Sequence, residues 1–150
     1  MTKIVHPVAG ALAMLTIAVF WLSTAVFELA GTPEMIVAVK TAIPWGFLLL
    51  IPAMAAIGGS GFSLSRGRWA GLVGTKLRRM RIIAANGLIV LIPAALFLAA
   101  EAKAGHFGAG FYSAQAIELV AGALNLALLA LNMRDGFRLS GRMRRGRSTQ

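Results

Sequence analysis

The chain has 150 residues, of which 58% are hydrophobic and only 13% are charged, and it contains no cysteine. A soluble domain is nearer half apolar and a quarter charged, so this composition excludes an ordinary soluble domain. The lack of cysteine excludes disulfides, thiol catalysis and thiolate metal sites. The net charge of +10 lies beside apolar segments, which favours attraction to anionic lipid headgroups over binding to nucleic acid.

Four apolar stretches follow one another along the chain, over residues 6–28, 35–57, 80–100 and 111–133. Each is close to the roughly 20 residues that a helix needs to cross the hydrocarbon core of a bilayer. The sequence therefore predicts an all-α membrane protein, a four-transmembrane-helix bundle in one domain over residues 1–137. A basic loop is expected over 58–79, and residues 138–150 are expected to form a basic, disordered tail.

The basic residues gather in two segments, which fall on the same side of the predicted bundle. Positively charged loops stay in the cytoplasm, so we expect both termini in the cytoplasm of a bacterium, with the chain crossing the inner membrane several times. The two short links between spans then face outward. The basic residues of the loop and the tail are Arg66, Arg68, Lys76, Arg78, Arg79, Arg81, Arg134, Arg138, Arg142, Arg144, Arg145 and Arg147.

A similar motif occurs in the second and third spans, where a glycine is followed by a proline six residues later. The two copies are Gly46 to Pro52 and Gly87 to Pro93. They are consistent with broken helices around a site at mid-membrane, as in some transporters. The favoured interpretation is two proline-kinked helices that pack through small residues, because proline and glycine are common in membrane helices.

Ionisable side chains inside a span are costly and mark candidate functional sites. Glu28 closes the first span, Lys40 lies near the outer end of the second, and Glu118 lies near the outer end of the fourth. We expect these three residues, with Gln115, to form an ion cluster or a ligand-binding site near the outer face. The alternative is that Lys40 extends its ammonium outward to the headgroups.

The fourth span carries a polar stripe at three- and four-residue steps, which places its members on one helix face. Such a face is expected to point into the bundle. Asn86 of the third span has a depth similar to that of Asn125, so these interior polar residues are expected to form a hydrogen bond. The stripe consists of Gln115, Glu118, Gly122, Asn125, Leu129 and Asn132.

The chain has two histidines, His6 and His106, and imidazole is a usual axial ligand of haem b. The predicted topology places them on opposite sides of the membrane, so they cannot ligate one haem in a monomer. His6 is the better candidate for cofactor binding, with a methionine such as Met54 or Met80 as the sixth ligand. Methionine is also a routine filler of hydrophobic cores.

The sequence contains no catalytic motif and no spacing typical of a metal site. Its leading interpretation is a non-enzymatic membrane subunit or binding protein with a polar interior site near the outer face, associating as a homodimer or within a larger membrane complex. One alternative is a haem b protein for electron transfer, with His6 as the ligand. A second is a small-solute or ion transporter or channel that uses Glu28, Lys40 and Glu118.

Overall fold

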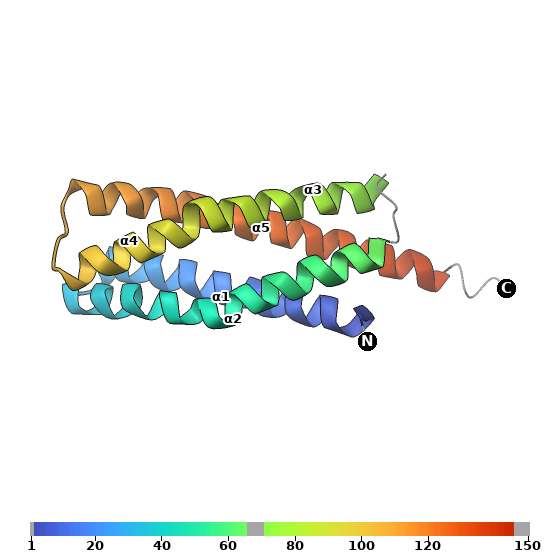
Figure 1. Ribbon diagram of the computed structural model, residues 1–150, viewed down its shortest axis with the longest axis horizontal. Coiled ribbons are helices and arrows are strands. Elements are labelled where there is room, and N and C mark those ends of the chain that lie inside the picture. The colour runs from blue at the N-terminus through green and yellow to red at the C-terminus, as the bar shows by residue number, and fades with distance from the viewer. Residues whose placement is uncertain (1, 66–70, 146–150) are drawn as a thin grey trace.

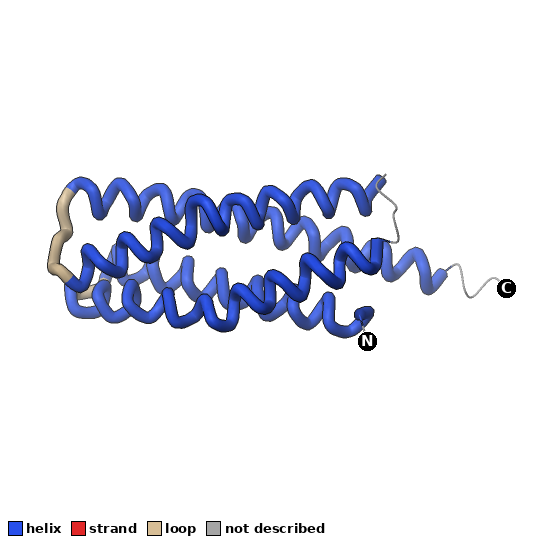
Figure 2. Tube along the Cα trace, in the orientation of Figure 1, coloured by secondary structure: helices blue, strands red, loops and turns tan. Residues whose placement is uncertain are grey.

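The computed structural model describes residues 2–65 and 71–145, and all regular structure within them is helical. The helices lie side by side as a long bundle (Figure 1), and short loops join them at one end (Figure 2). In chain order they are α1 (Thr2–Ala30), α2 (Pro33–Ser65), α3 (Gly71–Asn86), the π-helical segment η1 (Gly87–Leu91), α4 (Ile92–Lys103) and α5 (Ala109–Arg145).

Four helical segments of the described chain are long and apolar enough to cross a membrane, and α3, η1 and α4 together form the third of them. This arrangement indicates a multi-pass membrane protein. In Figure 1, α1 and α3 begin and α5 ends at the same end of the bundle. We call it the basic end, because Lys76 and Arg79 lie in the first turns of α3, and Arg134 and Arg79 both contact Asp135. The opposite end, which carries the two short links, is the loop end.

The link between α1 and α2 is short because its residues end one helix and begin the next. A Cβ on Gly31 would lie 2.5 Å from the Phe27 carbonyl oxygen, so only glycine fits there. Thr32 accepts a hydrogen bond from the Met35 amide at 3.5 Å, and Pro33 occupies the first helical position. These are the residue types that start a helix.

At the basic end, the helices extend beyond the predicted spans. α2 continues to Ser65 and α3 begins at Gly71, so most of the expected loop 58–79 extends the two spanning helices. α5 continues to Arg145, into the segment expected to be a disordered tail. The hydropathy pattern ends where charges begin, but backbone hydrogen bonding carries a helix beyond the apolar residues. Arg66, Arg68 and Arg147 lie outside the described residues.

Small side chains let α1 and α2 approach closely near the basic end. Ala9, Ala13, Ala53 and Ile57 form a buried cluster there, and Met54 and Met80 pack against it. Small residues at helix interfaces are typical of membrane bundles, where close backbone contact replaces the hydrophobic effect as the driving force.

The third span bends because α3 passes into α4 through the π-helical segment η1. The Ile92 amide bonds to the Gly87 carbonyl, five residues back, and Pro93 follows at the start of α4. A proline has no amide hydrogen and clashes with the preceding turn, so the wider π turn accommodates it. The two Gly-to-Pro motifs are therefore not equivalent, since α2 remains α-helical through Pro52.

Gly122 allows α1 and α5 to come into contact. A Cβ at this position would lie 2.9 Å from Cδ1 of Trp21, and the Trp21 indole donates a 2.8 Å hydrogen bond to the Leu119 carbonyl.

We predict that Gly122→Leu displaces Trp21 and lowers the free energy of unfolding by about 1–3 kcal/mol, the usual effect of overpacking.

Thermal unfolding in detergent measures this effect. Gly110→Leu is the matched control, because it lies on the same helix where an added side chain meets open space. Equal melting temperatures for the two variants would contradict the proposed role of Gly122.

Candidate functional site

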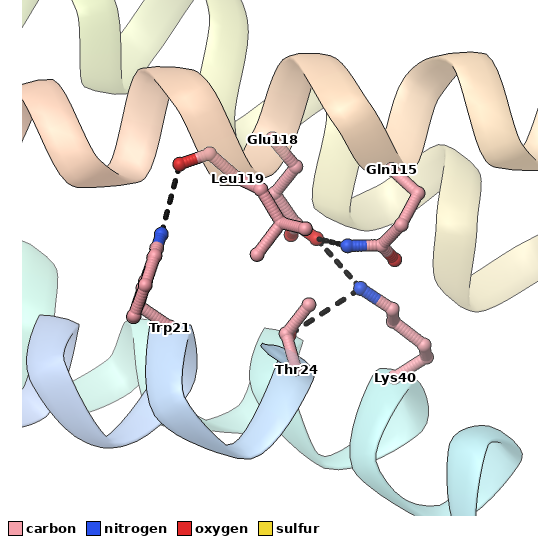
Figure 3. Close-up of polar contacts among 6 residues, drawn as sticks. All are labelled: Trp21, Thr24, Lys40, Gln115, Glu118 and Leu119. Atoms are coloured by element: carbon pink, nitrogen blue, oxygen red, sulfur yellow. Dashed lines mark hydrogen bonds and ion pairs between the residues drawn. The ribbon is translucent and has the colours of Figure 1, made fainter. Parts of the chain in front are cut away.

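A buried ion pair joins α2 to α5 near the loop end (Figure 3). The Lys40 side chain is only 1% exposed, and its Nζ atom donates to Oε2 of Glu118 at 2.6 Å. Nζ also lies 3.4 Å from the hydroxyl oxygen of Thr24 on α1. Lys40 therefore does not extend outward to the headgroups, and its charge is compensated inside the bundle.

Gln115 and Glu28 lie near this ion pair, and each has a buried oxygen that accepts no hydrogen bond from the described residues. Gln115 Nε2 donates to the same Glu118 oxygen at 3.4 Å. Glu28 is near enough to interact electrostatically with both Lys40 and Glu118. One carboxylate oxygen of Glu28 and the amide oxygen of Gln115 are buried without a hydrogen-bond partner among the described residues. The structure thus brings the four expected residues together, with Lys40 and Glu118 in direct contact.

A cavity of about 560 Å³ extends from this ion pair toward the basic end. Glu118 and Thr24 line it at one end and Arg81 lines it near the other, with apolar side chains between. Exposed residues also line it, namely Ile51 and Phe62 on α2 and Leu88 on η1, so the cavity opens to the bundle surface between α2 and the third span.

Polar residues on α5 also hold the third span in place. Asn86 Nδ2 donates to Asn125 Oδ1 and to the Ala121 carbonyl, both at 2.9 Å. Asn125 is 2% exposed and lines the cavity. The stripe on α5 faces the bundle interior, since Gln115, Asn125, Leu129 and Asn132 are all buried.

Asp135 is a buried acid at the basic end that the hydropathy and charge patterns do not single out. Asp135 Oδ2 accepts from Arg79 at 2.7 Å, and its other oxygen lies 3.5 Å from Arg134 Nε. The side-chain amide of Asn132 lies 3.5 Å from the Lys76 carbonyl oxygen, which adds a further polar contact between α5 and α3. Asp135 lies three residues after Asn132 in an otherwise basic segment, and this position continues the polar stripe.

The two histidines lie outside the cavity lining. His6 Nδ1 lies 2.9 Å from Ser60 Oγ, and Ser60 donates its one hydroxyl hydrogen to the Ala56 carbonyl. His106 is 68% exposed and lies 3.7 Å from Glu101.

Comparison of the chain with protein-family models, curated proteins and solved structures gives no match. Within the described residues, no three His, Asp or Glu side chains gather where they could hold a metal ion. The geometry of the ion pair and the cavity must therefore support any proposal about function.

We predict that Lys40→Met destabilises the protein by about 3–5 kcal/mol, because it leaves Glu118 charged and unpaired in a buried position. The double variant Lys40→Met/Glu118→Gln removes both charges and should recover most of this loss. Thermal unfolding of the two single variants and the double variant forms the cycle that measures the coupling. Additive effects of the two substitutions would contradict a direct pair.

Haem binding at His6 stays a hypothesis, and it makes a distinct spectroscopic prediction. Protein purified with added haem should show a Soret band that His6→Ala removes and His106→Ala leaves intact. A haem-supplemented sample without that band, or a band unaffected by His6→Ala, would contradict the hypothesis.

Proposed function

We propose that this protein is a non-enzymatic inner-membrane binding protein that holds the hydrocarbon chain of an amphiphilic molecule in its lateral cavity. The observation that carries the proposal is the cavity itself, an apolar space with a buried ion pair at one end. The proposal places the basic end in the cytoplasm, because basic residues of membrane proteins remain on that side.

The size and lining of the cavity support this interpretation. Its volume of about 560 Å³ falls within the roughly 300–1,000 Å³ typical of small-molecule sites. At about 1.5 Å of rise per residue, the lining from Arg81 to Ala95 covers roughly 21 Å of the third span. A long, narrow, apolar space of this kind suits an extended hydrocarbon chain.

The lateral opening explains how such a ligand would arrive. Ile51, Phe62 and Leu88 are exposed at the cavity, so a chain could enter sideways from the bilayer. A ligand entering from water would first have to pass the headgroups. The ion pair closes the far end with a polar boundary that a hydrocarbon chain does not cross.

Trp21 and Trp45 provide two reporters for a test of this proposal. Trp21 lines the cavity, whereas Trp45 is 74% exposed and does not line it. The double variant Trp45→Phe/Trp69→Phe retains Trp21 as its single tryptophan. The double variant Trp21→Phe/Trp69→Phe retains Trp45 as its single tryptophan. Brominated phosphatidylcholine, diluted into unlabelled lipid vesicles, quenches a tryptophan that its chains contact.

We predict that Ala84→Phe reduces the quenching of Trp21 at least twofold, because Ala84 lines the cavity and phenylalanine would fill it. Ala85→Phe is the matched control, since Ala85 is the next residue of α3, is also exposed and lies outside the lining. Trp45 should respond to neither substitution. Equal quenching of Trp21 in both variants would overturn the proposal.

A further inference from the structure

The two ends of the cavity differ in charge. At the loop end, the Lys40–Glu118 pair is internally compensated, with 2.6 Å between its charged atoms. At the other end, Arg81 lines the cavity, and Lys76, Arg78 and Arg79 lie within five residues of it on α3. Among the described acidic residues, Asp135 is the one at this end, and Arg79 and Arg134 already contact it.

We propose that the cavity binds an anionic phospholipid of the surrounding bilayer in one orientation. Its phosphate lies at Arg81, one of its hydrocarbon chains fills the cavity, and the chain ends below the Lys40–Glu118 pair. This inference rests on the proposed function and adds to it the class of ligand, its leaflet and the residue that selects it.

The position of Arg81 supports the role of a phosphate-binding residue. Its side chain is exposed, and it lines the same cavity as the apolar residues Leu77 and Ala84 on α3. Arginine offers several N–H donors in one plane, and it binds a phosphate with two parallel hydrogen bonds. A headgroup held there leaves its chain directly at the opening of the cavity.

Charge complementarity favours an anionic headgroup over a zwitterionic one. A choline headgroup would bring its own cation beside Arg81, whereas a glycerol headgroup brings none. A basic residue near an anionic membrane surface contributes about 1 kcal/mol, which corresponds to roughly a fivefold preference. The inference predicts at least this preference for the anionic lipid at Trp21.

The test compares two brominated lipids with the same chains, phosphatidylglycerol and phosphatidylcholine, in the protein that retains Trp21 alone. Phosphatidylglycerol should quench Trp21 at roughly fivefold lower mole fraction. Arg81→Gln should abolish most of this preference. Arg81→Lys, which keeps the charge, should retain part of it and shows that the site still folds.

Arg78→Gln is the matched control, because Arg78 is an exposed arginine of the same helix that lies outside the cavity lining. Both variants lose one positive charge, so the general attraction of the protein for anionic lipid falls equally. Only Arg81→Gln should remove the additional preference at Trp21.

The remaining outcomes each contradict a different statement. Equal effects of Arg81→Gln and Arg78→Gln, with cavity-dependent quenching by phosphatidylcholine intact, overturn this inference and leave the proposed function standing. Quenching that is insensitive to Ala84→Phe overturns the proposed function itself. If neither lipid quenches Trp21 while both quench Trp45, no lipid chain reaches the cavity, and both the proposed function and the lipid site are wrong.

Discussion

The ion pair between Lys40 and Glu118 is the constraint on which the arrangement of this bundle depends. A lone charge in the hydrocarbon core costs several kcal/mol, and a partner at hydrogen-bond distance offsets much of that cost. The pair forms only if α2 and α5 lie in one register, with Thr24 of α1 beside them. In that register the polar stripe of α5 faces the interior of the bundle, where Asn125 forms a hydrogen bond with Asn86.

The cavity follows from where these partners lie. Polar contacts fasten α3 to α5, through Asn86 with Asn125 and through Arg79 with Asp135. The buried cluster of Ala9, Ala13, Ala53 and Ile57 instead packs α2 against α1. The helices α2 and α3 are therefore held against different neighbours. The bend at η1 also directs α4, and not α3, toward α2. As a result, a space remains between α2 and α3.

Much of this arrangement can be predicted from the sequence, because hydropathy and charge act over whole segments. The four helices and the inward stripe on α5 follow from such patterns. The helix ends at Ser65 and Gly71 do not, since backbone hydrogen bonds continue into polar sequence. The π turn before Pro93 and the partner of Asp135 depend on tertiary packing. The cavity depends on the same packing, because no single helix contains it.

The charge distribution also explains why a ligand would have one orientation. A cavity with the same polarity at both ends would accept an amphiphile either way. Here the ammonium of Lys40 is already neutralised by Glu118, so a phosphate gains little at that end. Arg81 lies at the other end among further cations of α3, where the described basic residues outnumber the acidic ones and favour a phosphate. The buried ion pair that aligns the helices therefore also leaves the basic end as the favourable place for an anionic headgroup.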